Sequence, residues 1–248
     1  MLSRTADPRS APVGFFDSGV GGKCILEAFR RICPGEDTVY IADCANCPYG
    51  NRTDSEITAL SAANVDELLS FGCKLIVVAC NTATAAAIDH LRRKYPDVPF
   101  VGIEPAVKPA ALRSKSSVVA VLATQGTFNG RLYRETAAKF ARDVTVLTVV
   151  ADEFVSMVER GDVSGASAED AVRRRLEPLL AAGADHIVLG CTHFPHLKKV
   201  MEKVVRGRAA LVDPSEAVAV RIKNVLDERG LSAPVSCRPG VNREVVRR

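Results

Sequence analysis

The sequence contains no tryptophan, no run of 18 apolar residues and no strong excess of charge of either sign. Without a long apolar run, we expect no transmembrane helix. The first twelve residues, MLSRTADPRSAP, lack the apolar core of a signal peptide, so we expect a cytoplasmic protein. The net charge is only +4, and Lys and Arg are spread along the chain, which argues against a nucleic-acid-binding surface.

The remaining composition is that of an ordinary globular protein, with 47% hydrophobic and 25% charged residues. A chain of 248 residues is long enough for one or two domains. Eight cysteines are many, but a chain of this size does not need disulfides to stabilise its core. In a reducing compartment we expect them to be free thiols.

Short apolar runs alternate with helical patterns over almost the whole chain. Such alternation predicts βαβ units and parallel sheets with helices on both faces. The predicted strands are 13–16, 38–42, 75–79, 96–103, 118–122, 144–150, 187–189 and 211–214. The predicted helices are 23–32, 55–71, 81–95, 130–140, 152–160, 168–182 and 215–228.

Two pairs of segments repeat at a similar distance. VGFFDSG resembles VAVLATQGT about 106 residues later, and LIVVACNTA resembles HIVLGCTHF 111 residues later. This repetition predicts two pseudo-symmetric, doubly wound α/β domains with the active site in the cleft between them. We expect 12–105 plus 212–230 to form the first domain and 106–211 the second. Residues 1–11 and 231–248 are expected to be flexible tails.

The repeat places Cys80 and Cys191 at equivalent strand tips, each followed by a polar residue. A helix N-terminus next to such a cysteine favours thiolate. Most free cysteines are simply small buried hydrophobic residues, but two at matched positions favour a catalytic role. Two opposed thiols suit removal of a carbon-bound proton on one face and its return on the other, with no cofactor. A hydrolytic enzyme would instead need one cysteine and an orienting histidine.

Seven segments occur in the same order as in a known family: GFFDSGVGG, CPYGNR, VVACNTAT, GIEPAVKPA, ATQGT, LGCTHFPHL and LVDPSEA. Over residues 13–219 the chain thereby resembles the glutamate racemases of the cofactor-independent aspartate/glutamate racemase family. The resemblance implies an isomerase that interconverts L- and D-glutamate without cofactor or metal, supplies D-glutamate for peptidoglycan synthesis and forms a homodimer. The alternatives are a racemase for aspartate or another amino acid and an inactive binding paralogue.

The resemblance also implies roles for individual residues. Cys80 would act on the D-amino acid with help from Asp17, and Cys191 would act on the L-amino acid beside Glu159 and His193. The implied substrate-binding residues are Asp17, Ser18, Tyr49, Gly50, Asn81, Thr82, Thr127, Thr192 and His193.

Several of these residues have simpler explanations. Asp17 and Ser18 have the residue types of a turn or helix cap. Glu159 lies near a predicted helix end and could be solvated, and His193 could cap a helix. The chain also departs from many family members, with Ala151-Asp152 in place of Cys-Pro and Gly130 where some have Ser.

A further motif, Cys44-x-x-Cys47, follows the second predicted strand. It could serve redox chemistry or form half of a zinc site. No second Cys-x-x-Cys or histidine pair lies near it in the sequence, so we expect no metal site. A thiol-disulfide oxidoreductase is the alternative from a different mechanistic class.

Overall fold

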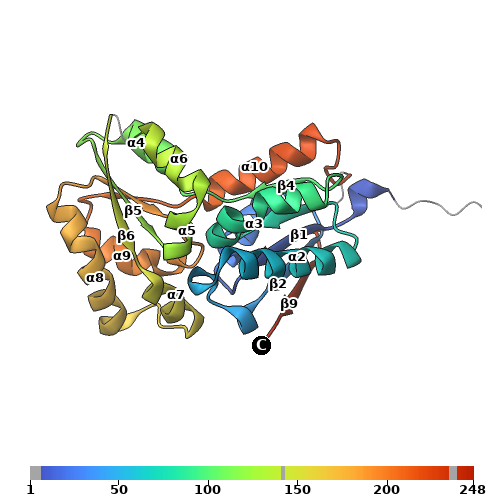
Figure 1. Ribbon diagram of the computed structural model, residues 1–248, viewed down its shortest axis with the longest axis horizontal. Coiled ribbons are helices and arrows are strands. Elements are labelled where there is room, and N and C mark those ends of the chain that lie inside the picture. The colour runs from blue at the N-terminus through green and yellow to red at the C-terminus, as the bar shows by residue number, and fades with distance from the viewer. Residues whose placement is uncertain (1–6, 141–142, 235–238) are drawn as a thin grey trace, which may run out of the picture.

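The computed structural model describes residues 7–140, 143–234 and 239–248 and contains two sheets in which all strands run parallel (Figure 1). The first sheet has the strand order β4-β3-β1-β2-β9. Its strands are β1 (Val13–Asp17), β2 (Thr38–Ala42), β3 (Leu75–Val78), β4 (Phe100–Gly102) and β9 (Asn242–Val246). The second sheet has the order β6-β5-β7-β8. Its strands are β5 (Val118–Ala123), β6 (Thr145–Val150), β7 (His186–Leu189) and β8 (Ala210–Val212).

Helices connect the strands, as the alternating pattern predicts. In the first half of the chain they are α1 (Lys23–Ile32), α2 (Asp54–Ser70), α3 (Asn81–Lys94), α4 (Val107–Arg113) and α5 (Gln125–Asn129). The others are α6 (Arg131–Phe140), α7 (Asp152–Glu159), α8 (Gly165–Ala181), α9 (Lys198–Val205) and α10 (Ser215–Glu228). None of the helices in these described ranges is both long and apolar enough to cross a membrane.

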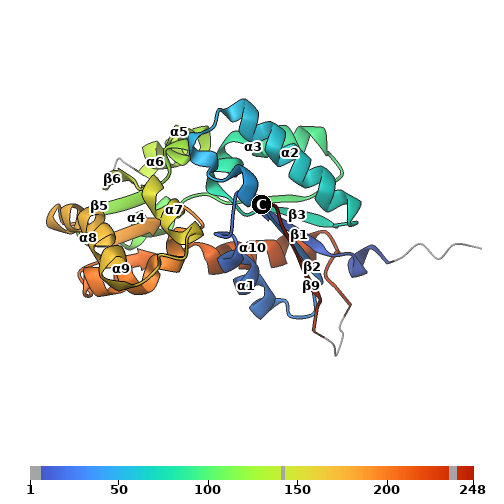
Figure 2. The ribbon, with the colours of Figure 1, turned by 90° about the horizontal axis from the view of Figure 1, so that it is seen from below.

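The first sheet is covered on both faces because successive strand residues point to opposite sides. Phe15 and the strand residues on the same face pack against α1 and α10, whereas Phe16 and the residues on the opposite face pack against α2 and α3. Figure 2 shows these two helix pairs on opposite sides of the sheet. This arrangement explains why the strands are apolar at nearly every position.

The second sheet is built in the same way. Its residues Leu122 and Leu189 pack with α7, α8 and α9, and Val121 and Val188 pack with α4 and α6 on the other face. The two hydrophobic cores of this half are separate from those of the first half. The prediction of two doubly wound α/β domains is therefore confirmed.

The two sheets also share one topology. Strands β4-β3-β1-β2 of the first sheet correspond in order to β8-β7-β5-β6 of the second. The strand before Cys80 is β3 and the strand before Cys191 is β7, so the two cysteines occupy equivalent positions in the two halves. The internal repeat in the sequence thus reflects a structural repeat.

Helix α10 crosses back from the second domain to the first. It lies beside α1 (Figure 2), and Ala219, Ile222 and Leu226 are its buried residues in the core that the two helices share. The predicted limits of the two domains are compatible with this arrangement but stay a prediction.

The expectation of a flexible tail over 231–248 is wrong for its last part. Strand β9 pairs in parallel with β2, from Asn242 beside Thr38 to Val246 beside Ala42. The charged composition of this segment suggested a solvated tail, but charged side chains are equally common on edge strands. Residues 235–238 lie outside the described residues.

The expected N-terminal tail, residues 1–11, is only partly described, because residues 1–6 lie outside the described ranges. Residues Pro8–Ser10 form a short 3-10 helix, η1, whose N-cap is Asp7. The Lys74 ammonium donates a hydrogen bond to the Arg9 carbonyl at 2.6 Å. Arg9 therefore contacts the first domain, and the flexibility of residues 1–11 stays a prediction.

A buried ion pair joins these terminal segments to the first sheet. Lys74 and Glu36 lie 2.6 Å apart with side chains 3% and 6% exposed, and Glu36 also accepts a hydrogen bond from the Ala233 amide. Lys74→Ala would leave a buried carboxylate without its cation, so we expect a loss of about 3–5 kcal/mol in unfolding free energy.

Urea denaturation measures this loss, and Lys94→Ala is the control because Lys94 forms an exposed ion pair with Asp66. The control should shift the unfolding midpoint far less. Equal shifts in the two variants would show that the buried pair contributes no more than a surface pair.

Candidate active site

Cys80 lies two residues after the end of β3 and is the N-cap residue of α3. Its sulfur accepts a hydrogen bond from the Ala83 amide at 3.5 Å, and its thiol donates to the Ser18 hydroxyl at 3.7 Å. The side chain is buried. Burial and the nearby Asp17 carboxylate raise the pKa of this thiol to about 12. Cys80 is therefore a thiol in this closed form and needs a neighbouring base to become a nucleophile or base.

Cys191 follows β7 and is also buried. Its sulfur lies 3.7 Å from Nδ1 of His193, two residues further on. Burial raises the pKa of this thiol well above its usual value. Each cysteine thus has its own polar partners, Ser18 and Asp17 for Cys80 and His193 for Cys191.

Asp17 lies at the end of β1, fully buried beneath the site. One of its oxygens accepts a hydrogen bond from the Gly22 amide at 2.8 Å, so it does stabilise the turn after the strand. The Thr192 hydroxyl, which comes from the second domain, lies 3.4 Å from the other oxygen. Burial raises the pKa of Asp17, although the facing His193 and the Gly22 amide oppose this. Asp17 is consequently suited to accepting a proton.

Glu159 and His193 form a pair beside Cys191. Glu159 is the last residue of α7, and its Oε1 lies 2.6 Å from Nε2 of His193. The same oxygen accepts a hydrogen bond from the Val20 amide of the first domain at 2.9 Å. Burial alone would raise the pKa of Glu159, but the hydrogen bonds from His193 and Val20 outweigh it and leave the pKa below 4.5. Glu159 is therefore not a solvated residue at a helix end.

Both cysteines line one small cavity between the two domains. Its twelve lining residues are Ser18, Pro48, Tyr49, Gly50, Cys80, Asn81, Thr82, Thr124, Val155, Cys191, Thr192 and His193. The cavity has an empty volume of about 260 Å³, but only about 10 Å³ of it is accessible to the centre of a water molecule. This is about the space needed for one water molecule. A larger ligand can enter only if the domains move apart.

The polar groups of this cavity suit an anionic ligand even though none of the described residues that line it is Lys or Arg. Asn81 is 3% exposed, and neither its amide nitrogen nor its oxygen has a hydrogen-bond partner among the described residues. A buried amide without a partner is costly, so Asn81 points to a bound polar group. Hydroxyls and the N–H groups at the start of α3 supply further donors.

Tyr49 is held in place by two residues that the sequence did not single out. Its hydroxyl donates to the Asp43 carboxylate at 2.6 Å and accepts from the Asn64 amide at 3.1 Å. Burial and Asp43 raise the pKa of Tyr49. Asp43 and Asn64 are fully buried. The sequence marks Asp43 only as a polar residue just after a predicted strand, and Asn64 only as a polar residue on the apolar face of a predicted helix.

Three threonine hydroxyls join the domains next to the cavity. Thr82 from α3 lies 2.9 Å from Thr124 and 3.5 Å from Thr127, measured between their hydroxyl oxygens. Thr124 lies in the ATQGT segment but was not among the predicted residues. Of the predicted residues, Asp17, Glu159 and Thr127 lie behind the lining rather than in it. Pro48 and Val155 are apolar lining residues that the sequence gave no reason to select.

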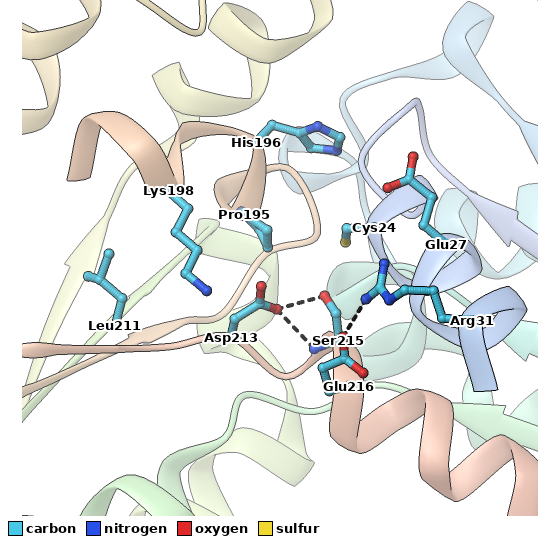
Figure 3. Close-up of a pocket in the computed structure, with 10 residues that line it drawn as sticks. All are labelled: Cys24, Glu27, Arg31, Pro195, His196, Lys198, Leu211, Asp213, Ser215 and Glu216. Carbon is cyan, nitrogen blue, oxygen red and sulfur yellow. Dashed lines mark hydrogen bonds and ion pairs between the residues drawn. The ribbon is translucent and has the colours of Figure 1, made fainter. Parts of the chain in front are cut away.

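A second, wider pocket lies at the junction of the domains, with a volume of about 430 Å³ (Figure 3). Its walls come from α1, α9 and the segment around β8, and an Arg31–Glu216 ion pair crosses one side. Cys24 of this pocket donates a hydrogen bond to the Thr192 carbonyl at 3.6 Å. Neither Cys80 nor Cys191 lines it, so the smaller cavity is the candidate reaction site.

The seven cysteines within the described ranges are free thiols, as expected for them, and Cys237 lies outside those ranges. The two domains supply one thiol each to a cavity with room for about one water molecule. Such an arrangement can remove a proton from one face of a bound carbon and deliver a proton to the other.

The lowered pKa of Glu159 predicts a pH-dependent contribution to stability. Because the folded-state pKa lies below 4.5, the contribution is fully present above 4.5 and is lost as the pH falls through the folded-state value. The difference in unfolding free energy between wild type and Glu159→Gln should therefore be largest near neutral pH and shrink below pH 4.5. Urea denaturation at a series of pH values measures it, and a pH-independent difference would contradict the pairing.

Comparisons with known proteins agree with this geometry. Residues 23–222 match the Asp/Glu/Hydantoin racemase family. A glutamate racemase of Roseiflexus sp. is 43% identical over 95% of this chain and 86% of its own length.

Two solved structures are similar over nearly the whole chain. Glutamate racemase of Francisella tularensis in complex with D-glutamate has a TM-score of 0.83 and 29% identity, covering 96% of this chain and 88% of its own. Escherichia coli glutamate racemase, in complex with L-glutamate and the activator UDP-MurNAc-ala, has a TM-score of 0.82 and 33% identity, covering 94% and 88%. The chain therefore belongs to the Asp/Glu/Hydantoin racemase family, within the group formed by the glutamate racemases.

Proposed function

We propose that this protein interconverts L- and D-glutamate by removing the α-proton with one of the thiols Cys80 and Cys191 and delivering a proton from the other. The observation that carries the proposal is the presence of two buried thiols, from equivalent strands of two related domains, in one cavity. The glutamate racemases that resemble the chain, two of them with bound glutamate, support the choice of substrate.

Each thiol needs a base because burial keeps it protonated. On the first side, Asp17 takes the proton of Cys80. On the second side, Glu159 accepts a hydrogen bond from Nε2–H of His193, which leaves the lone pair of Nδ1 facing the Cys191 thiol. His193 can then take the proton of Cys191. Glu159 acts here as a positioning residue that fixes the tautomer of His193.

The reaction exchanges one proton for another at the α-carbon. The Cys80 thiolate removes the α-proton of D-glutamate, and the resulting carbanion takes a proton from the Cys191 thiol on its opposite face. The product is L-glutamate, and the reverse direction starts from the Cys191 thiolate. The two thiols thus exchange the roles of acid and base.

Substrate binding uses neutral donors. The hydroxyls of Ser18, Thr82 and Thr192, the Asn81 amide and the N–H groups at the α3 N-terminus are suited to the two carboxylates of glutamate. Tyr49 and Gly50 form the wall beside them, and Thr127 acts through its contact with Thr82. Glutamate has ten non-hydrogen atoms and exceeds the closed cavity, so binding requires the domains to open and close.

Several further properties belong to the same proposal. We place the enzyme in the cytoplasm, where D-glutamate would serve peptidoglycan synthesis, and expect a homodimer. Neither a nucleic acid nor a membrane is an expected partner. The reaction as written uses only groups of the protein and needs no cofactor.

The alternatives have weaker support. Thiol-disulfide exchange at Cys44 and Cys47 needs thiolate, but burial and the nearby Glu159 raise the pKa of Cys44 to about 11 and raise that of Cys47 further. An inactive paralogue would not need both thiols and their bases. A preference for aspartate remains compatible with the lining residues, because one methylene changes binding by only about 1–3 kcal/mol.

The purified protein should convert L-glutamate into D-glutamate without added pyridoxal phosphate or metal. Circular dichroism of the substrate follows the conversion. Aspartate should react about 10–200-fold more slowly, the range for one missing methylene. Faster turnover of aspartate would reject glutamate as the substrate, and no turnover of either amino acid would reject the proposed activity.

Single substitutions should separate the two thiols. Cys80→Ser and Cys191→Ser should each lower racemisation by at least about 100-fold, since each direction uses both groups and a hydroxyl is a poor base. Elimination from a β-substituted glutamate needs only the first proton removal. Cys191→Ser should therefore retain elimination from the D-isomer, and Cys80→Ser from the L-isomer. The same enantiomer preference in both variants would contradict the two-base assignment.

A further inference from the structure

The Cys44-x-x-Cys47 segment of the first domain lies against the Glu159–His193 pair of the second domain. Cys47 offers its sulfur, Glu159 a carboxylate oxygen and His193 a ring nitrogen, and these three atoms all lie within 4.8 Å of one another. Cys47 belongs to the first domain, two residues before Tyr49, whereas Glu159 and His193 belong to the second. The sequence suggested Cys44-x-x-Cys47 as half of a zinc site but did not indicate these partners, because Glu159 and His193 both lie more than 100 positions after Cys47.

The backbone of the first domain approaches this cluster closely. Gly19 of the first domain lies against it, and a Cβ at this position would fall 2.0 Å from Oε1 of Glu159 and 3.2 Å from the sulfur of Cys47. A glycine is needed for such a close approach.

Cys44 is a fourth candidate ligand. After burial, the Glu159 carboxylate is the main cause of the raised pKa of its thiol, which places the two groups close together. Cys44 is half-buried at the start of a short 3-10 helix, η2 (Cys44–Asn46), and joining the other three as a ligand would require its side chain to turn toward them. Two sulfurs, one imidazole and one carboxylate form a donor set typical of zinc.

The spacing needs little adjustment for a metal ion. Tetrahedral zinc with bonds of about 2.0 Å to nitrogen or oxygen and about 2.3 Å to sulfur places its ligands about 3.3–3.8 Å apart. Because the three atoms lie within 4.8 Å of one another, Cys47 needs to approach by at most about 1 Å, and the 2.6 Å between Glu159 and His193 must widen by less than that. A side-chain rotation at Cys47 and a small shift of Glu159 are sufficient.

We infer that Cys47, Glu159 and His193, together with Cys44, bind a thiophilic divalent cation such as Zn²⁺ and that its binding inhibits the enzyme. The site joins one domain to the other. A bound ion would hold the domains closed over a cavity that admits no glutamate, and it would occupy the two residues that serve Cys191. Inhibition, unlike metal binding, rests on the proposed racemase function.

Metal binding is tested first without any activity measurement. Titration of the full-length protein with Co²⁺ should produce the charge-transfer absorption of cobalt–thiolate bonds, and added Zn²⁺ should remove it. Loss of a residue that only contacts a metal ligand typically lowers metal affinity by about 10–100-fold. Because Cys47 is proposed as a ligand itself, Cys47→Ser should lower the Co²⁺ affinity by more than this, and Cys44→Ser should lower it as well. Cys33→Ser is the matched control, because Cys33 is a half-buried thiol in another part of the first domain.

Activity is measured second, with the same variants. Zn²⁺ should inhibit wild type and Cys33→Ser, a chelator should restore them, and Cys47→Ser should keep its racemase activity and resist inhibition. Cys47→Ser retains Cys80, Cys191 and His193, so unchanged inhibition in this variant would place the metal on the catalytic thiols and overturn the inference. Absence of cobalt–thiolate absorption in wild type would also overturn it. Metal binding by a protein without racemase activity would instead reject only the proposed function.

Discussion

The structure depends on the polar contacts that close one domain over the other. The Val20 amide binds Glu159, and the Thr82 hydroxyl binds Thr124, in each case across the domain boundary. The threonine pair is buried and the Val20–Glu159 contact is partly buried, so each group would lose a partner if the domains separated without water entering. Closure therefore leaves room for only about one water molecule in the cavity, and the resulting burial raises the pKa of both thiols. Opening is the only route by which a substrate the size of glutamate can enter.

The duplicated fold explains why two thiols face one cavity, but the neighbouring residues make them different. On the first side a buried carboxylate, Asp17, sits behind Cys80, and its own pKa is raised by burial. On the second side an imidazole stands next to Cys191 and is oriented by a carboxylate. A racemase must remove protons from two mirror-image substrates, and a repeat with unequal neighbours supplies two bases adapted to opposite faces. The same unequal neighbours bring Cys47 to Glu159, where the inferred metal site lies.

Much of the fold followed from the sequence because apolar runs and helical periodicity report burial directly, and the repeat located both cysteines. The three missed helices are short: α4 has seven residues with a proline near its start, α5 has five, and α9 has eight and directly follows a 3-10 turn. Strand β9 was missed because the charges of an edge strand resemble those of a tail. Of the site, motifs indicated the groups around both thiols. The supporting contacts of Asp43 with Tyr49, and of Cys47 with Glu159, could not be predicted, because tertiary packing alone brings them together.

The most direct test of two thiols acting from opposite faces is the isotope content of both enantiomers early in the reaction. L-glutamate is incubated with the enzyme in deuterated water, the enantiomers are separated at low conversion, and the deuterium at each α-carbon is measured by mass spectrometry. If Cys191 removes the proton and Cys80 returns one to the other face, the new D-glutamate carries deuterium while the remaining L-glutamate keeps its proton. Equal early labelling of both enantiomers would show that one group serves both faces and would contradict the two-thiol mechanism.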